Sequence, residues 1–550
     1  MQKPVILLIL DGWGIAPPGP GNALSLATLK HVPRYFVSYP HAGIVASGPA
    51  VGLPDGEDGN TETGHLNIGA GRIVYQDLPR INMSIADGSF FRNEAFLTAV
   101  KYAQGHGTNI HIMGLISDGG VHSSKDHLYA LLELMKRENV PKVFLHLFTD
   151  GRDSPPQSSI RFITEVEERC KTLGVGKIAT IMGRYYAMDR DRRWERTEEA
   201  YKALTEVIER TANSAQSAIE ASYAKGKTDE FVDPTVILDL DNTPYPRVSE
   251  HDAVIFYNFR IDRPRELTRA FVLSDFETRP YGASFDPYAV KYFHKHVEAV
   301  DDDRNTPFTR AVVLPNILFV TMTEYERGLP CTVAFPPSQV KVPMGRVFAE
   351  QGLRQLRLSE TEKERFVTYY FNGMREDPFA GEDHLIVPSP KVPTYDLKPE
   401  MSAYELTTKL IDRLAIGVYS LFVLNFANAD MVAHTGNIQA AIRAVEVVDE
   451  CVGKIVQHVL AIGGTCIITA DHGNVEEMLG PNGEMDTEHS TFPVPLIIID
   501  HMFDTMPSVL PNGKLGDIAP TILALRGMPI PGEMVGKNLV ADLLMQRRFV

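Results

Sequence analysis

The chain has 550 residues, more than one compact core normally organises, so its length favours two or more domains. Its 54 basic and 70 acidic residues give a net charge of −16, which argues against a general nucleic-acid or anionic-membrane surface. The four cysteines form no C-x-x-C pair, so they predict neither a zinc site nor a disulfide framework, and they favour a reducing cytoplasmic environment. No window approaches the roughly 20 apolar residues of a membrane-spanning helix.

Residues 5–10 form an uninterrupted apolar run that ends at Asp11-Gly12. This pattern predicts a buried parallel strand. Asp11 then lies at the carboxyl edge of the sheet, where open α/β sheets bind their ligands. An isolated aspartate in this position is more typical of a turn or a helix cap. The distant acid and histidine groups described below favour the functional interpretation.

A loop over residues 47–60 leads into the segment TETGHLNIGAGR, residues 61–72. Its glycines allow backbone amides to approach an anion, and Thr61 supplies one hydroxyl beside them. One interpretation of Thr61 is a helix N-cap, followed by solvated Glu62 and His65. The same position also suits a nucleophile, because free amides at the start of a helix can hold a phosphoryl group.

From about residue 80 to residue 337 the chain alternates strand-like and helix-like segments, which predicts an inserted α/β domain. Strands are expected over residues 111–117, 142–148, 177–182 and 253–259. A cation, an imidazole or a carboxylate follows each of these predicted strands, and this repeated pattern favours one anion pocket. The groups are His122, Arg152, Asp153, Arg184, Arg190, Arg260 and Arg263.

Two arginine patterns in this region differ in what they predict. Arg260 and Arg263 are three residues apart, so on a helix they would share one face and clamp one anion. Arg192, Arg193 and Arg196 are more typical of a solvated charge run.

The rest of the chain returns to the first domain. Residues 274–310 are polar and contain three consecutive aspartates, which predicts a surface excursion. The tripeptide Phe335-Pro336-Pro337 predicts a linker. Later strands are expected over residues 365–371, 420–426, 466–470 and 494–499. The predicted domains are residues 1–77 together with 338–550, and residues 78–337.

Acid and histidine groups follow these later strands. Asp430 and His434 are spaced i, i+4, so one helical turn would place both on one face. Each group alone is a weak signal, but a set of seven suits two metal ions, and mixed carboxylate and imidazole ligands suit Mn²⁺ or Zn²⁺. The seven candidate ligands are Asp11, Thr61, Asp430, His434, Asp471, His472 and His489.

The hydroxyl of Thr61 is a weak nucleophile at neutral pH, and metal coordination is the best candidate for activating it. Lys363 could add a second positive charge, although a lysine within SETEKERFVT is equally typical of a charged surface helix.

At these positions the sequence resembles the cofactor-independent (2,3-bisphosphoglycerate-independent) phosphoglycerate mutases of the alkaline phosphatase superfamily. The resemblance covers nearly the whole chain. The motifs that carry it, in family order, are LILDGWG, GHLNIGAGR, MGLISDGGVHS, DGRDSPP, GRYYAMDRDRRW, NFRIDRPR, FVTMTEYE, AFPP, SETEK, NADMVAHTG, TADHGN and HSTFPVP.

The resemblance implies a two-domain α/β fold. One domain is discontinuous and alkaline-phosphatase-like, with a central, mostly parallel sheet, and the other is an inserted α/β transferase domain. It implies interconversion of 3-phosphoglycerate and 2-phosphoglycerate in glycolysis and gluconeogenesis, by a cytoplasmic monomer that needs no 2,3-bisphosphoglycerate.

The resemblance also implies roles for individual residues. One divalent ion, with Mn²⁺ favoured over Mg²⁺, Co²⁺ or Zn²⁺, would be held by Asp430, His434 and His489. The second ion would be held by Asp11, Thr61, Asp471 and His472. Substrate would be bound by His122, Arg152, Asp153, Arg184, Arg190, Arg260, Arg263 and Lys363.

In the expected reaction Thr61 attacks the substrate phosphorus and becomes phosphothreonine, and the glycerate reorients before it takes the phosphate back. Asp153 would act as acid and base for the glycerate hydroxyls, and Lys363 would stabilise transition-state charge. The sequence departs from the family at two positions: GNTETGH places Thr61 where a GNSEVGH-like segment has Ser, and Phe366 replaces a histidine.

Two other functions are compatible with the same residues. A phosphomonoester hydrolase would use this site with water as acceptor, although it would not need an arginine-rich inserted domain. A regulatory metal-binding protein would keep the metal ligands without catalysis, and Thr61 in place of the family's serine would then mark the loss of catalytic activity.

Overall fold

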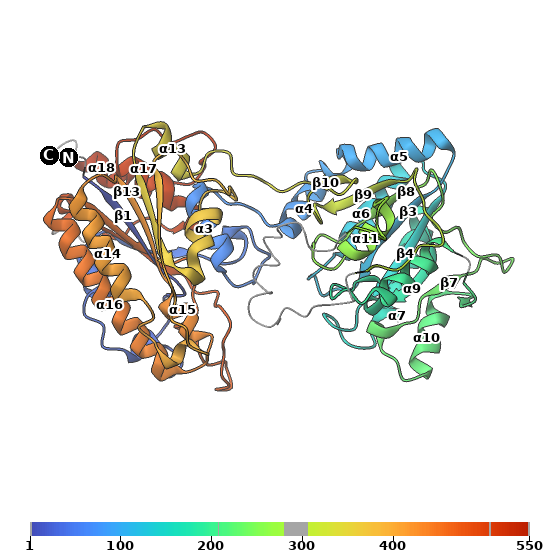
Figure 1. The fold of residues 1–550 in the computed structure, drawn as a ribbon, viewed down its shortest axis with the longest axis horizontal. Coiled ribbons are helices and arrows are strands. Elements are labelled where there is room, and N and C mark those ends of the chain that lie inside the picture. The colour runs from blue at the N-terminus through green and yellow to red at the C-terminus, as the bar shows by residue number, and fades with distance from the viewer. Residues whose placement is uncertain (1–2, 207, 280–305, 505, 507, 548–550) are drawn as a thin grey trace. The chain divides into compact units, whose positions relative to one another are not determined.

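The computed structural model describes residues 3–206, 208–279, 306–504, 506 and 508–547. The chain divides into two compact units, Met1–Pro79 with Ser338–Val550, called the split unit below, and Arg80–Pro337, called the inserted unit (Figure 1). The sequence predicted these divisions after residues 77 and 337. Most of the predicted surface excursion, residues 280–305, lies outside the described residues.

The split unit contains a sheet of eight described strands in the order β12-β11-β13-β1-β14-β15-β2-β16. The neighbours from β12 to β14 are parallel, whereas β15 is antiparallel to both β14 and β2. The strands are β1 Val5–Leu10, β2 His41–Val45, β11 Gln355–Glu360, β12 Glu382–Val387, β13 Leu421–Phe426, β14 Thr465–Thr469, β15 Val494–Ile499 and β16 Gly513–Lys514.

The central strand β1 is apolar along its whole length because both of its faces are covered. All six of its residues are buried, and it pairs with β13 on one side and β14 on the other. In this register Leu10 lies opposite Phe426, and Ile9 lies opposite Thr469. The residues that follow the three strands therefore emerge together at one edge of the sheet.

The antiparallel strand β15 brings a further loop to this edge. Since Thr469 pairs with Leu496, the residues before β15 lie beside the residues after β14. The loop over residues 470–493 therefore both starts and ends at the carboxyl edge of the parallel strands. The strands predicted over residues 420–426, 466–470 and 494–499 are confirmed to within one residue.

The inserted unit has its own sheet, with eight described strands in the order β10-β9-β8-β3-β4-β5-β7-β6. Among the described strands of this second sheet, only β5 and β7 pair in an antiparallel manner. The strands are β3 Ile110–Ile116, β4 Val143–Thr149, β5 Lys177–Gly183, β6 Thr211–Ala212, β7 Thr235–Ile237, β8 Ala253–Phe256, β9 Leu318–Thr323 and β10 Thr332–Phe335.

Helices cover the two sheets. In the split unit, α14 and α16 pack together on one side of the sheet, and α3 and α13 lie on the other (Figure 1). No helix of the described residues is both long and apolar enough to cross a membrane. The split unit contains α1 Ala23–Leu26, α2 Val32–Ser38, α3 Thr61–Ala70, α13 Met344–Glu350, α14 Ala403–Ile416, α15 Asn428–Ala433, α16 Ile438–Ala461, α17 Ile518–Leu525 and α18 Ala541–Arg547, and α4 Asp77–Ala86 spans the boundary. The inserted unit contains α5 Glu94–His106, α6 Lys125–Arg137, α7 Ser159–Leu173, α8 Arg184–Ala187, α9 Trp194–Thr205, α10 Ala215–Ala224 and α11 Arg265–Val272.

The strand predicted over residues 365–371 is wrong. Phe366–Tyr370 form a π-helical turn in which the Phe366 and Tyr370 rings stack with centroids 5.6 Å apart. The strand lies earlier in the chain, at β11. The sequence did not predict β11, because Arg357 and Glu360 interrupt its apolar pattern. Both side chains are fully buried, and Arg357 is paired with Glu382.

The helical spacing predicted for Arg260 and Arg263 is also wrong. Strand β8 ends at Phe256, and residues 261–264 form a bend before α11 begins at Arg265. Pro264 stands at the helix start, and a proline disfavours helical geometry in the residue before it. The two guanidinium groups consequently have different partners, described below.

Candidate metal centre and anion pocket

Thr61 is the first helical residue of α3. The capping role belongs to its neighbour Asn60, whose side chain accepts a hydrogen bond from the Thr63 amide at 2.9 Å. Capping therefore leaves the hydroxyl of Thr61 available for other contacts. It lies 2.9 Å from Nε2 of His472 and 3.1 Å from Nζ of Lys363.

Lys363 is buried beside this hydroxyl, so a surface role for Lys363 is wrong. It follows β11, and its Nζ lies 2.7 Å from Oδ1 of Asp11 and 2.8 Å from Oδ2 of Asp430. Burial opposes the charge, but Asp11 and Asp430 outweigh it and raise the pKa of Lys363 above its ordinary value. Lys363 is therefore a fixed cation between two carboxylates.

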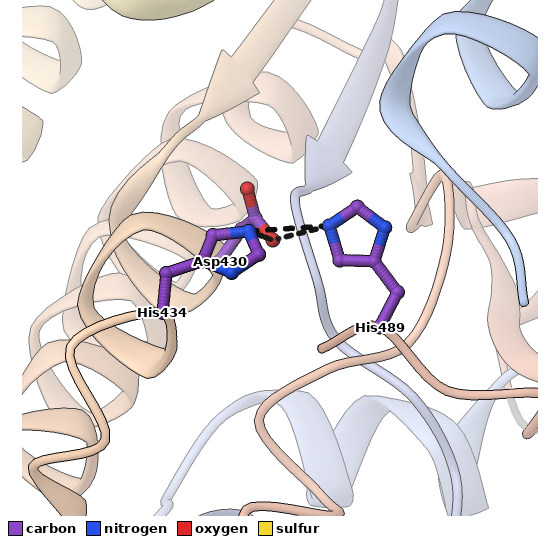
Figure 2. A group of neighbouring side chains, drawn as sticks. All are labelled: Asp430, His434 and His489. Carbon is purple, nitrogen blue, oxygen red and sulfur yellow. Dashed lines mark hydrogen bonds and ion pairs between the residues drawn. The ribbon is translucent and has the colours of Figure 1, made fainter. Parts of the chain in front are cut away.

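Asp430 and His434 come from α15 and its C-terminal end, and His489 comes from a separate loop that faces them (Figure 2). Nε2 of His434 and Nε2 of His489 lie 3.1 and 3.3 Å from the same Asp430 oxygen. The other nitrogen of each ring is directed to a backbone carbonyl, at Thr487 and Gly59 respectively. Because each Nδ1 donates to a carbonyl, both Nε2 lone pairs converge on one point, as in metal sites.

Asp471 and His472 follow β14 and are fully buried. Nε2 of His472 lies 3.4 Å from Asp11 and 3.5 Å from Asp471. Burial opposes protonation, but the Asp471 carboxylate raises the pKa of His472 to about 10. Among the described residues, none donates a hydrogen bond to either oxygen of Asp471, although Nδ1 of His65 lies 3.2 Å from one of them. Buried carboxylate oxygens without donors are costly, so the group fits a cation.

Three supporting residues were missed by sequence reasoning. His65, expected as a solvated side chain, is fully buried and lies 3.0 Å from the Thr61 carbonyl. Asn425 donates to Asp11 at 2.6 Å, and Asn474 donates to Asp430 at 2.9 Å. Asn474 stands within TADHGN, so its place in a strand-end motif was an available signal.

The groups predicted at strand ends in the inserted unit also meet, at the carboxyl edge of β3, β4, β5 and β8. Arg184 is buried and pairs with Asp150 at 2.7 Å and with Asp153, and its Nη2 lies 2.9 Å from Nε2 of His122. Burial, followed by the positive charge of Arg184, lowers the pKa of His122 to about 3. This imidazole is therefore neutral at physiological pH.

Two of the remaining arginines pair with Asp262, a residue that sequence reasoning also missed. Asp262 pairs with Arg190 at 2.7 Å and with Arg260 at 3.2 Å. Arg263 donates instead to the carbonyl of Met188 at 3.0 Å, and burial with the nearby Arg190 lowers its pKa to about 10.

Arg152 is the most exposed of the predicted substrate residues that form ion pairs, and its nearest carboxylate is Glu230 at 3.7 Å. A cavity of about 240 Å³ opens beside it. Arg196 lies 3.8 Å above the Tyr185 ring and 3.2 Å from Asp189, so the predicted solvated run is wrong for this residue. The cavity is lined by Arg152, Arg184, Tyr185, Met188, Asp189, Asp191, Arg193, Arg196, Glu230, Phe231 and Arg263.

These features define a class of protein. It is an α/β enzyme with one carboxylate and imidazole cluster of the kind that binds divalent cations, and one guanidinium cluster of the kind that binds anions.

Comparisons with known proteins specify the family. Residues 81–327 match the family described as BPG-independent PGAM N-terminus (iPGM_N). A 2,3-bisphosphoglycerate-independent phosphoglycerate mutase from Moorella thermoacetica is 50% identical over 540 residues, which cover 98% of this chain and 99% of that protein. The 2,3-bisphosphoglycerate-independent phosphoglycerate mutase 1 of Methanosarcina barkeri is 47% identical over 541 residues, which cover 98% of each chain.

A crystal structure of Leishmania mexicana phosphoglycerate mutase, determined at low cobalt concentration, is similar to the fold. Its TM-score is 0.58 at 29% identity, over 98% of this chain and 97% of that one. The chain belongs to the 2,3-bisphosphoglycerate-independent phosphoglycerate mutases, and it is an isomerase.

Proposed function

We propose that this phosphoglycerate mutase interconverts 3-phosphoglycerate and 2-phosphoglycerate through a phosphothreonine at Thr61, with two divalent metal ions. The observation that carries the proposal is the position of the Thr61 hydroxyl, 2.9 Å from His472 and 3.1 Å from Lys363. A buried threonine hydroxyl held among a lysine, an imidazole and three carboxylates has the surroundings of an activated nucleophile.

The residues present fit two metal ions. Asp11, Asp430 and Asp471 are buried within one cluster, where Lys363 is the nearest fixed cation. Such an excess of buried negative charge is stabilised when cations bind. Asp430, His434 and His489 would hold one ion, and Asp11, Thr61, Asp471 and His472 would hold the other.

The bound ions would act as Lewis acids that favour the deprotonated hydroxyl and neutralise phosphoryl charge. Mixed oxygen and nitrogen ligands favour Mn²⁺, with Mg²⁺, Co²⁺ and Zn²⁺ as competitors. Co²⁺ is also the metal named with the similar Leishmania structure.

The protein's own groups have separate parts in the transfer. The Thr61 oxygen forms a bond to phosphorus while the bond from phosphorus to the glycerate oxygen breaks. Lys363 cannot serve as the base, because its neighbouring carboxylates keep it protonated. It donates to the Thr61 oxygen and stabilises the charge that develops there.

In the inserted unit, Arg152, Arg184, Arg190, Arg260 and Arg263 would bind the carboxylate and phosphate of phosphoglycerate. His122, kept neutral by burial and Arg184, would donate or accept one hydrogen bond without adding charge. Asp153 would exchange protons with the glycerate hydroxyls, so that either oxygen can take back the phosphoryl group. The reaction belongs to glycolysis and gluconeogenesis, and we propose that the working form is a cytoplasmic monomer.

Thr61→Ala and Thr61→Ser distinguish a nucleophilic hydroxyl from a structural one. Each enzyme is incubated with 3-phosphoglycerate and Mn²⁺ without 2,3-bisphosphoglycerate, and 2-phosphoglycerate and free phosphate are quantified by ³¹P NMR. Mass spectrometry of the quenched protein detects the phosphoenzyme. The wild type and Thr61→Ser should form 2-phosphoglycerate and the phosphoenzyme, and Thr61→Ala should form neither.

Two outcomes would contradict the proposal. Turnover by Thr61→Ala at a rate comparable with the wild type would exclude Thr61 as the nucleophile. Free phosphate as the main product of the wild type would identify a phosphomonoester hydrolase.

A further inference from the structure

A single buried carboxylate, that of Glu476, joins three chain segments that carry candidate ligands, one after β1 and two within the loop over residues 470–493. Glu476 is 3% exposed and lies in the loop between β14 and β15. It is not among the candidate metal ligands, and its side chain contacts the chain segments that carry them.

The contacts of Glu476 are divided between its two oxygens. Oε2 accepts hydrogen bonds from the amides of Gly14 and Asn474, both at 2.9 Å. Oε1 accepts a hydrogen bond from the hydroxyl of Ser490. Gly14 belongs to the loop of Asp11, Asn474 follows His472, and Ser490 follows His489, so each contact reaches a segment with a candidate ligand.

The surrounding backbone is shaped to admit this carboxylate. A Cβ atom built on Gly14 would stand 2.1 Å from Oε1 of Glu476, and one built on Gly473 would stand 2.1 Å from the same atom. The space for the carboxylate therefore exists only because both positions lack a side chain. Glu476 binds the backbone amide of Asn474, and the side chain of Asn474 donates a hydrogen bond to Asp430 at 2.9 Å.

We propose that Glu476 is a positioning residue that preassembles the two-metal site, an inference that rests on the proposed function. Its hydrogen bonds fix the relative positions of the chain segments of Asp11, Asp471 and His489, and through Asn474 they orient Asp430. Without them the ligands must be ordered when the ions bind, and metal affinity falls. Loss of partners that orient metal ligands typically costs about 10- to 100-fold in affinity.

The hydrogen bonds rather than the negative charge account for this role. Glutamine can place its carbonyl oxygen where Oε2 accepts from Gly14 and Asn474. Its amide group can then donate to the Ser490 oxygen, because a hydroxyl both donates and accepts. Glu476→Gln should therefore retain metal affinity, whereas Glu476→Ala leaves two buried amides and one hydroxyl without their acceptor.

The test measures Mn²⁺ binding directly, with the full chain and without substrate. Free Mn²⁺ is followed by electron paramagnetic resonance during titration of the wild type, Glu476→Ala, Glu476→Gln and the control Glu477→Ala. Glu477 is the adjacent residue of the same type, but it is partly exposed. We expect affinity at least about tenfold weaker in Glu476→Ala for one or both ions, and within about threefold of wild type in the other two variants.

Circular dichroism in EDTA establishes that each variant is folded. If Glu476→Ala is not folded, Ser490→Ala replaces it, since that change frees Oε1 and leaves both backbone contacts intact. Ser490→Ala should then weaken Mn²⁺ binding by more than the threefold range allowed for the Glu477→Ala control.

The outcomes separate this inference from the proposed function. A wild type that binds no Mn²⁺ would overturn the proposed metal site and the inference with it. If the wild type binds two ions and Glu476→Ala, or Ser490→Ala in its place, binds them equally well, only the positioning role of Glu476 is excluded. If Glu476→Gln binds Mn²⁺ as weakly as Glu476→Ala does, the loss of affinity is due to the charge of Glu476, and the inference is also overturned.

Discussion

Replacement of Lys363 by Met removes the cation that is paired with the buried carboxylates of Asp11 and Asp430. Its ammonium lies 2.7 Å from Asp11 and 2.8 Å from Asp430, and all three side chains are buried. Breaking such a pair costs about 3 to 5 kcal/mol, because the partner charges remain buried. An unfolding entropy of about 2.1 cal/mol/K per residue over roughly 290 residues gives about 0.6 kcal/mol per degree. The Tm of this unit should therefore fall by about 5 to 8 °C.

Differential scanning calorimetry in EDTA at pH 7 measures this change. Lys409→Met is the matched control, because the side chain of Lys409 on α14 is 42% exposed and its partner Glu405 lies 3.0 Å away. The control should change Tm by about 1 °C or less. Excess Mn²⁺ should narrow the difference between Lys363→Met and the wild type, since added cations compensate the same carboxylates. A decrease no larger than that of the control would refute the assignment of Lys363 as the balancing cation.

Three further predictions concern the metal ions, the pocket and pH. Dialysis against EDTA should abolish 2-phosphoglycerate formation and Mn²⁺ should restore it, whereas full activity of metal-free protein would contradict the two-metal proposal. Arg263→Ala should raise the KM for 3-phosphoglycerate about tenfold or more, while the exposed Arg413→Ala leaves it unchanged; equal KM values would exclude Arg263 from substrate binding. Burial lowers the pKa of His127 from 6.5 to about 3, so the unfolded chain binds the extra proton and stability falls as pH decreases from 6.5. Between pH 6.5 and 5 the free energy of unfolding, measured in urea, should therefore fall by about 2 kcal/mol. His127→Gln should abolish this decrease. The same pH dependence in the variant and the wild type would refute the assignment to His127.

The residues at strand ends could be predicted because two simple rules act together. An apolar run flanked by a turn identifies a buried strand, and neighbouring parallel strands end at the same edge. Asp11 and Asp471 follow β1 and β14, which are adjacent in the sheet, so their separation of 460 residues in sequence does not separate them in space. Arg184 and His122 meet in the inserted unit for the same reason.

Residues that support these groups were harder to predict, because their pattern is that of the core. Asn425 lies within the buried strand β13, where nothing in the sequence distinguishes a polar contact from an interruption of the strand. His65 follows Thr61 by one helical turn, and a solvated position was the simpler expectation. Glu476 gave no signal at all, since its partners Gly14 and Ser490 are distant in sequence and two of its three contacts are to backbone amides.

Each unit has a charged cluster at the carboxyl edge of its own sheet, mainly carboxylates in the split unit and mainly guanidinium groups in the inserted unit. Each cluster also contains a group of the opposite charge. In the split unit Lys363 lies between the carboxylates of Asp11 and Asp430, and in the inserted unit Asp262 lies between the guanidinium groups of Arg190 and Arg260. These internal pairs keep each cluster folded when no ligand is bound, because an uncompensated buried charge would be far more costly. A metal ion or a substrate anion bound as proposed would therefore compete with an existing partner. The affinity measured for either ligand would then reflect the free energy of its new contacts minus that of the internal contacts that it replaces.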